Sequence, residues 1–126
     1  MRLLLDTHVL LWALGAPARL PAPITRALRD PANEVQASAA SIWEVAIKAA
    51  LGKISADVEE IVESVVEVGF DELAVTMAHA RRVRSLPQHH RDPFDRMLVA
   101  QALEEGLTIV THDRAFAAYR VPTAWE

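Results

Sequence analysis

Short blocks of apolar and polar residues alternate along this chain, and the spacing within each block predicts a strand or a helix. The first apolar block, Leu3–Leu5, is typical of a strand buried on both faces, and Asp6 ends it abruptly. Polarity alternates from residue to residue across Glu34–Ser38, as in a half-buried strand. By the same criteria, further strands are expected at residues 70–75, 107–111 and 121–124. The predicted strands are spread over the whole chain, so other elements must connect them.

Helices are predicted between these strands. Apolar residues recur at helical spacing across residues 41–51, and Gly52 is a typical residue for ending that helix. The pair Asp92-Pro93 is a typical helix start, and that helix is expected to end at Glu105, before Gly106. Other helices are expected at residues 9–14, 21–30, 57–68, 76–85 and 114–119. Strands that alternate with helices predict an α/β fold whose parallel sheet is covered on both faces.

Composition and charge narrow the classes of function only slightly. The 126 residues are 52% hydrophobic, which fits one domain over residues 1–126 with a continuous core. The formal net charge is −4, so charge alone predicts no basic surface, although a cluster of metal-binding acids would itself lower it. The chain has no cysteine, so any metal must be held by oxygen or imidazole ligands. No apolar stretch reaches the roughly 18 residues of a membrane span, so we expect a soluble cytoplasmic protein.

Four acidic residues occur where the predicted elements would bring them to one edge of the sheet. Asp6 ends the first strand and Asp113 follows the strand at 107–111. Glu44 and Asp95 lie in the first turns of two predicted helices. Ligands of open parallel sheets bind beyond the carboxyl ends of the strands. We therefore take these four acids as a candidate site.

Three of these acids also have structural interpretations. Asp6 and Asp113 are suited to capping the helices that follow them. Glu44 completes a capping box with Ser41 and faces Lys48 four residues on, which taken alone favours a structural role. For Glu44, a place in the site is favoured only because the other candidate acids are expected nearby.

The two acids at the start of the Asp92-Pro93 helix are expected to differ in role. Asp92 directly precedes proline, which predicts Asp92 as the helix N-cap and puts Asp95 at the third helical position. From there Asp95 heads an apolar stripe that continues at Leu98 and Ala102, where burial of a carboxylate is costly. Asp95 is therefore the stronger metal-site candidate.

A cluster of carboxylates suits phosphodiester hydrolysis when divalent cations are bound. Close carboxylates repel one another and raise one another's pKa, and a hard cation such as Mg²⁺ or Mn²⁺ relieves that repulsion. A bound ion polarises a phosphoryl oxygen, activates water and stabilises the leaving oxygen. The cluster predicts metal-dependent hydrolysis without specifying the substrate.

Histidines and arginines near the acids are the candidate substrate contacts. His90 and His112 lie near the predicted edge, and the histidines do not have a zinc-binding spacing. The other histidines, including His79, are expected at solvated positions. The arginines that flank the candidate acids, and so suit phosphate contacts, are Arg91, Arg96 and Arg114. Arg96 is alternatively placed to pair with Asp92, and Arg81–Arg84 are expected on a solvated helix face.

Four segments carry motifs that can be compared with known families: Leu4–Trp12, Ser38–Lys48, Asp92–Ala102 and Thr108–Asp113. Together they resemble a PIN domain of the VapC toxin type. They occur in the family's order and extend over almost the whole chain, so their combination is highly specific. The resemblance implies a three-layer α/β/α sandwich with a mainly parallel central sheet.

The same resemblance implies an endoribonuclease that depends on Mg²⁺ or Mn²⁺ and acts as the toxin of a type II toxin–antitoxin pair. The residues at the family's acidic positions, both catalytic and metal-binding, are Asp6, Glu44, Asp95 and Asp113. The residues that would support the site are Thr7, Ser41 and Thr111. RNA would be the substrate, and the partners would be a cognate antitoxin that blocks the site and a second copy of the chain. The resemblance is also compatible with a hetero-oligomer of toxin and antitoxin, and it leaves open whether Asp92 touches the metal.

Two other classes of function fit parts of the pattern. A phosphotransferase that forms an aspartyl phosphate also has an acid after a strand, but His8 stands where the haloacid-dehalogenase type has a second acid. A non-enzymatic module would keep the fold and bind RNA or a partner without cleavage. The intact set of acids favours the nuclease over this module.

Overall fold

The computed structural model describes residues 1–89 and 91–126, and its centre is an all-parallel sheet of five strands in the order β3-β2-β1-β4-β5. His90, a candidate substrate contact, lies outside the described residues. The strands are β1 (Arg2–Leu5), β2 (Glu34–Ser38), β3 (Asp71–Leu73), β4 (Thr108–Val110) and β5 (Thr123–Ala124). The predicted α/β class with a mainly parallel sheet is confirmed.

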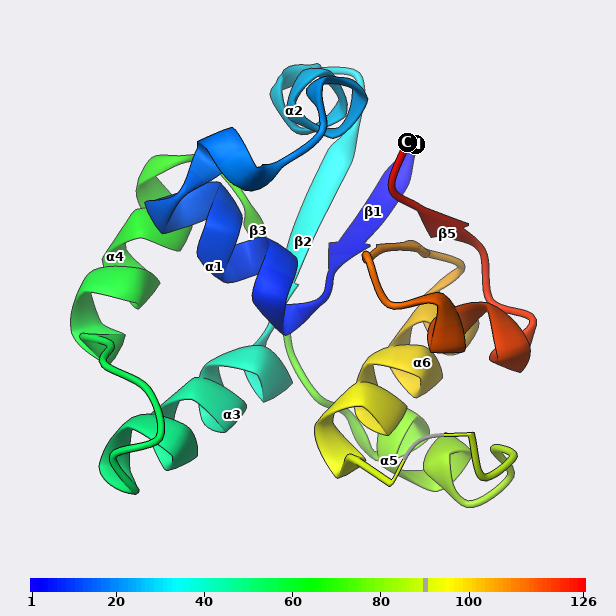
Figure 1. The fold of residues 1–126 in the computed structure, drawn as a ribbon. Helices are drawn as coiled ribbons and strands as arrows, with labels where there is room; N and C mark the ends of the chain where they lie inside the picture. The colour runs from blue at the N-terminus through cyan, green and yellow to red at the C-terminus, as the bar shows by residue number, and fades with distance from the viewer. Residues whose placement is uncertain (90) are drawn as a thin grey trace.

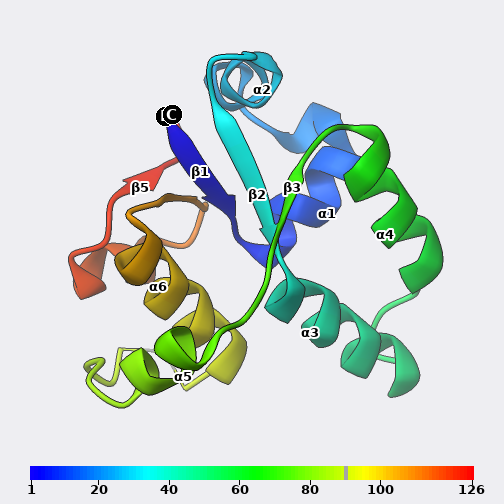
Figure 2. The ribbon, with the colours of Figure 1, turned by 180° about the vertical axis from the view of Figure 1, so that it is seen from behind.

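Helices connect the strands and cover both faces of the sheet (Figure 1). The α-helices are α1 (Thr7–Gly15), α2 (Ala22–Arg29), α3 (Ala39–Ala50), α4 (Val58–Glu67), α5 (Met77–Val83) and α6 (Pro93–Glu105). Two 3₁₀ helices, η1 (Pro17–Arg19) and η2 (Arg114–Tyr119), complete the helical segments. The view from behind shows α1 and α4 on one side of the strands and α5 and α6 on the other (Figure 2). None of the helices in the described part of the chain is long and apolar enough to cross a membrane.

Side chains of the central strand β1 divide between two hydrophobic cores, because successive residues of a strand point to opposite faces of the sheet. Leu3 and Leu5 pack in the same core as Val9 of α1. Leu4 packs in the other core, together with Leu98 of α6. The three leucines of β1 are buried, as the unbroken apolar run predicts for a strand covered on both faces.

The carboxyl ends of β1 and β4 lie side by side at the edge of the sheet where the candidate acids are found. Leu5 of β1 is in register with Val110 of β4, so Asp6 and Thr111 follow at the same level. The N–H of Asp6 donates to the carbonyl of Val110 at 3.1 Å and extends this pairing. At the end of β2, α3 begins directly after Ser38 and contacts α1, α4 and α6. Residues of β1, α3, α6 and the turn after β4 can therefore share one site.

Several boundaries differ from the sequence prediction by one or two residues. Ser38 is the N-cap of α3, since its hydroxyl accepts the N–H of Ala40 at 3.0 Å, and the helix begins at Ala39. The predicted capping box of Ser41 and Glu44 is therefore wrong, because both residues lie inside the helix. The strand expected at 70–75 is shorter, spanning only β3.

Candidate functional site

Asp6 is held between β1, α1 and β4. It is the N-cap of α1, where its Oδ1 accepts the N–H of Val9 at 2.8 Å, and its Oδ2 accepts the hydroxyl hydrogen of Thr111. Asp6 is only 6% exposed, and this burial raises the pKa of its carboxyl group. The hydrogen bonds from Thr111 and Val9 and the charge of His8 oppose the rise, whereas the carboxylate of Asp113 adds to it. The capping role and a place in the site are therefore compatible.

Glu44 is the second buried acid, at 5% exposure, and lies in α3. Its Oε1 accepts the hydroxyl hydrogen of Thr7 at 2.8 Å, and the hydroxyl of Ser41 lies 2.9 Å from that of Thr7. Its Oε2 lies 2.5 Å from Nζ of Lys48, the ion pair that the four-residue spacing predicts. Because Thr7 begins α1, these contacts join the helices that follow β1 and β2.

Asp92, Asp95 and Asp113 lie at the beginnings of two helices. Oδ1 of Asp92 accepts the first backbone N–H groups of α6 at 2.8 Å and 3.4 Å, which confirms the predicted N-cap. Asp95 is half-buried at the third position of α6. Asp113 caps η2 by accepting the N–H of Ala115 at 2.9 Å, and its own N–H donates to the hydroxyl of Thr111 at 3.0 Å. Thr111 therefore contacts both Asp6 and Asp113.

One small cavity of about 100 Å³ brings these acids together at the edge of the sheet. Its lining residues are Asp6, Thr7, His8, Glu44, Lys48, Asp92, Asp95, Asp113 and Phe116. All four candidate acids share this acidic cavity, and Asp92 adds a fifth carboxylate. The acids come from elements far apart in the sequence, so only the tertiary fold assembles them.

The acidic cavity offers a donor set that suits a hard divalent cation. Five carboxylates supply oxygen, and Mg²⁺ is commonly held by one or two carboxylates while waters and substrate phosphates complete its coordination. Among residues 1–89 and 91–126, no three histidine or acidic side chains are grouped closely enough to hold an ion together. The described residues therefore offer carboxylate oxygens that suit such a cation, but they do not form a closed cage.

Lys48 is a member of the acidic cavity that sequence reasoning treated only as the structural partner of Glu44. Its hydrogen bond with Glu44 raises the pKa of the ammonium group, and the charges of Glu44, Asp92 and Asp95 add to this effect. The signal in the sequence was the four-residue spacing from Glu44, which places the two side chains on one helix face. The ammonium group partly neutralises a site that otherwise concentrates negative charge.

Two histidines lie at the predicted edge of the sheet, in two neighbouring cavities. His8 lines the acidic cavity and is exposed. His112 lines a neighbouring cavity instead and stacks on Trp125, with 5.1 Å between the ring centroids. Arg114, a candidate phosphate contact, lines that second cavity, which shares Asp113 with the acidic one.

Arg96 corrects an expectation, because it neither faces the cavity nor pairs with Asp92. It is buried at 8% exposure, and its guanidinium group donates to the carbonyls of Val83, Leu86 and Pro87 at 2.7 to 3.3 Å. These carbonyls lie at and just after the end of α5, where helix geometry leaves acceptors without intrahelical donors. The planar, multi-donor guanidinium group satisfies several of them at once.

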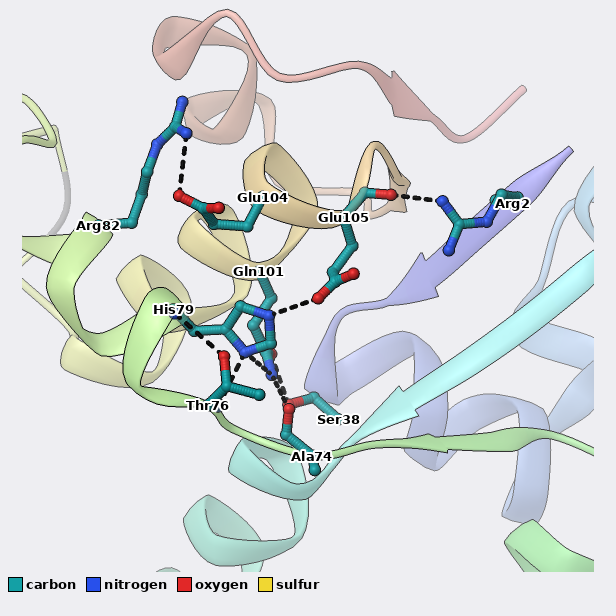
Figure 3. A network of polar contacts seen from close by, with 9 residues as sticks. All are labelled: Arg2, Ser38, Ala74, Thr76, His79, Arg82, Gln101, Glu104 and Glu105. Atoms are coloured by element: carbon teal, nitrogen blue, oxygen red, sulfur yellow. Dashed lines mark hydrogen bonds and ion pairs between the residues drawn. The ribbon is translucent and has the colours of Figure 1, made fainter.

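A buried polar network that joins residues of β2, α5 and α6 is the feature that sequence reasoning missed most completely (Figure 3). The hydroxyl of Ser38 donates to Oε1 of Gln101 at 2.6 Å, and Nε2 of Gln101 lies 3.5 Å from Nδ1 of His79. Nδ1 of His79 accepts the N–H of Thr76 at 3.1 Å, while its Nε2 lies 2.9 Å from Oε1 of Glu105. His79 is fully buried and not solvated as predicted. The network joins the start of α3, which carries Glu44, to α6, which carries Asp95.

Comparison with known proteins places this geometry in a wider context. The model of the PIN domain family matches residues 3–122. Ribonuclease VapC22 of Mycobacterium tuberculosis (strain ATCC 25618 / H37Rv) is 32% identical over 132 residues, and the match covers 97% of this chain and 97% of the relative. These two matches agree with the resemblance that the four sequence segments carry.

Similar solved structures include toxin–antitoxin proteins. VapBC2 from Rickettsia felis, bound to a DNA fragment from their promoter, has a TM-score of 0.71 at 14% identity and covers 100% of both chains. VapBC-5 from Mycobacterium tuberculosis has a TM-score of 0.59 at 22% identity, covering 93% of this chain and 89% of that chain. At such identities the likeness shows that the fold is shared.

Proposed function

The chain belongs to the PIN domain family, and on that premise we propose that it is a metal-dependent endoribonuclease. The observation that carries the proposal is the gathering of Asp6, Glu44, Asp95 and Asp113 around one cavity at the carboxyl edge of the sheet. Ribonuclease VapC22, to which the chain is similar over nearly its whole length, is named for the same activity. The substrate is RNA.

Mg²⁺ or Mn²⁺ is the cofactor that we infer for this site, and the residues that would hold it, directly or through bound water, are Asp6, Glu44, Asp95 and Asp113. When bound, such an ion withdraws electrons from a phosphoryl oxygen and lowers the pKa of water, which is the chemistry needed for phosphodiester hydrolysis. The cavity is lined mainly by carboxylates and the chain has no cysteine, so the ligands on offer are chiefly the oxygen donors that these two ions prefer.

Side chains around the acids fix their positions before a cation arrives. Thr111 and the N–H of Val9 orient the two oxygens of Asp6, and Thr7 orients Glu44. Asp92 caps α6 and thereby holds the helical turn that presents Asp95. Fixed ligands lose little conformational entropy when a metal or substrate binds, which favours both affinity and rate.

The partners that we propose are a cognate antitoxin and a second copy of the chain. Several similar structures are VapBC toxin–antitoxin complexes, which supports assignment of this chain as the toxin of such a pair. RNA as substrate makes the cytoplasm its place of action. Co-purification of the chain with the product of an adjacent small reading frame, and loss of cleavage in that complex, would test this assignment.

Cleavage of an RNA pool in the presence of Mg²⁺ or Mn²⁺ tests the nuclease proposal. The parent is expected to cleave, whereas Asp6→Asn and Asp95→Asn are expected to lose cleavage because each removes a carboxylate from the cavity. Asp71→Asn is a matched control, since Asp71 is an exposed acid on the edge strand β3.

The products and the variants each offer a way to overturn the proposal. Hydrolysis by activated water leaves a 5′-phosphate and a 3′-hydroxyl, so a cyclic 2′,3′-phosphate would contradict the mechanism. Equal cleavage by parent and by both Asn variants would place the chemistry elsewhere. A parent that binds Mn²⁺ and RNA without cleaving would favour a binding module of the same fold.

A further inference from the structure

Four aromatic rings form a continuous row beside the acidic cavity. The rings of His8 and Trp12 are stacked with 6.2 Å between their centroids, and Trp12 lies 6.0 Å from Trp125. Trp125 stacks on His112 at 5.1 Å with an interplanar angle of 26°. The row begins at His8, which lines the acidic cavity, and ends beside Asp113, which lines it as well. It therefore extends from one wall of the candidate active site to another.

The row borders a second cavity of about 400 Å³. Trp125, His112 and Asp113 line this cavity, so it shares a wall with the acidic cavity. His112 is exposed, and Trp125 is half-buried with part of its surface against the core that contains Leu5. Trp125 is thus fixed by packing while part of its surface remains open to solvent.

The charges around the row indicate which part of a nucleotide fits there. Asp113 and Glu126 line the second cavity and repel a phosphate, so the moiety placed in it must be the neutral base. Two arginines are available for the backbone: Arg114 lines the same cavity, and the guanidinium group of Arg19 lies 5.6 Å from the ring centroid of Trp12. Aromatic faces with flanking cations are the usual means of binding single-stranded nucleic acid.

We propose that Trp125 and His112 form a stacking platform for an unpaired base of the RNA substrate, next to the phosphodiester bond in the acidic cavity. This inference rests on the proposed ribonuclease function and deepens it by naming the side chains that would hold an unpaired base beside the cleaved bond. Bases inside a duplex are stacked on one another and cannot lie on a protein ring. The platform therefore selects single-stranded segments and positions them.

Binding of a 5′-fluorescein-labelled, mixed-sequence, 12-nucleotide RNA in EDTA tests the platform without cleavage. Trp125→Leu keeps apolar volume and removes the aromatic face, so we expect a Kd weaker by roughly tenfold. Trp125→Phe keeps an aromatic face, so its Kd should stay within about threefold of the parent. The matched control is Trp43→Leu, because Trp43 is 62% exposed on α3 and does not line either cavity.

Intrinsic fluorescence supplies a second measurement. It would not change on RNA addition if Trp125 had only a structural role. Stacking of a base quenches tryptophan emission, and the chain has three tryptophans. We expect RNA to quench the parent and Trp43→Leu alike, and to quench Trp125→Leu much less. A duplex of the same sequence should bind parent and Trp125→Leu with equal affinity. Parent-like RNA affinity in Trp125→Leu, or an equal loss in Trp43→Leu, would overturn the platform.

Two further comparisons keep the outcomes separate. If circular dichroism shows that Trp125→Leu does not fold, His112→Ala replaces it as the test, since His112 is exposed. Severalfold weaker RNA binding by His112→Ala supports the platform, and parent-like binding overturns it.

If the parent cleaves RNA and Trp125→Leu has the parent's KM and Kd, the platform fails and the nuclease stands. If Trp125→Leu binds more weakly and the parent never cleaves, the nuclease fails while the RNA surface stands. A parent that neither binds nor cleaves RNA overturns both.

Discussion

Two buried polar regions lie beside α3 and α6, and they are built on opposite electrostatic principles. In the network around Gln101, mostly neutral donors meet neutral acceptors, and a single acid, Glu105, contacts His79 (Figure 3). In the acidic cavity, five carboxylates are brought together and burial raises the pKa of Asp6. The first arrangement stabilises the fold, whereas the second concentrates like charges at a cost in stability.

The two regions do not differ in how completely their polar atoms are paired. Among the described residues, no buried side-chain nitrogen or oxygen lacks a hydrogen-bond partner. They differ in charge, since hydrogen bonds satisfy the carboxylates of the cavity without removing their mutual repulsion. A cation can remove that repulsion, so the region that weakens the fold is also the region for which we propose a ligand.

The largest expected effect is a loss of function when an acid of the acidic cavity is replaced. Asp6→Asn should lower RNA cleavage by about a hundredfold or more, because substitution of groups that only orient metal ligands already costs about 10- to 100-fold. The amide keeps an oxygen that can cap α1, so the fold should persist. Initial rates of RNA cleavage with Mn²⁺, alongside circular dichroism, provide the measurement. Retained cleavage in this variant would remove Asp6 from the site.

The next largest effect is a loss of stability when the network around Gln101 is interrupted. Gln101→Leu removes the acceptor of the Ser38 hydroxyl hydrogen and one contact of His79 Nδ1, in a site that is fully buried. We expect the free energy of unfolding to fall by about 2 kcal/mol. Urea unfolding at constant m-value checks this, with Gln88→Leu as a control at an exposed glutamine. A loss below about 0.5 kcal/mol, the range of ordinary surface substitutions, would mean that the network adds little.

A smaller effect concerns the charge balance of the acidic cavity. Lys48→Met removes the ammonium group from Glu44 and leaves a more negative cavity, so Mn²⁺ affinity should rise about fivefold, or roughly 1 kcal/mol. Solvent limits the effect because the side chain of Lys48 is 36% exposed. Calorimetric titration without RNA measures it, and Lys53→Met at an exposed lysine is the control. Unchanged or weaker Mn²⁺ binding would show that Lys48 does not oppose the cation.

The smallest effect is a pH dependence of folding stability that the Asp6 carboxyl group contributes. Burial raises the pKa of Asp6 in the folded chain above its unfolded value of about 3.9, so folding favours the protonated form. The stability associated with that form is fully present below the unfolded pKa and is lost as pH rises through the higher folded pKa. The parent should therefore become less stable relative to Asp6→Asn as pH rises across this window.

Thermal unfolding of both proteins between about pH 3.5 and pH 7 measures that difference. Added Mn²⁺ should shrink it at neutral pH, because the cation stabilises only a chain that retains the Asp6 carboxylate. A difference that is constant with pH would show that Asp6 titrates alike in the folded and unfolded chain.

Local chemistry explains which features were predictable from sequence. The limits of α6 follow from Asp92 and Pro93 at its start and from Gly106 at its end, where φ is +69° and glycine is favoured. The ion pair of Glu44 and Lys48 follows from helical spacing alone. The central strand follows from its unbroken run of leucines.

Long-range contacts explain what was missed. Ser41 matches a capping pattern, yet Ser38 caps α3, because β2 ends there and its hydroxyl also reaches Gln101, 63 positions away in the sequence. His79 has the sequence context of a solvated helix residue but is enclosed by α6. Arg96 follows a candidate acid but turns to the carbonyls after α5.

The sequence by itself determined the type and order of the elements and the identity of the acids, because turn residues, caps and apolar periodicity act over a few neighbouring positions. It also carried the family motifs that imply a nuclease. The tertiary structure decided which polar residues meet: it put Lys48 among five carboxylates, buried His79 and brought Trp125 beside His112. Such contacts depend on strand order and helix packing. These bring together segments that are far apart in the sequence, and no local sequence pattern encodes contacts between such segments.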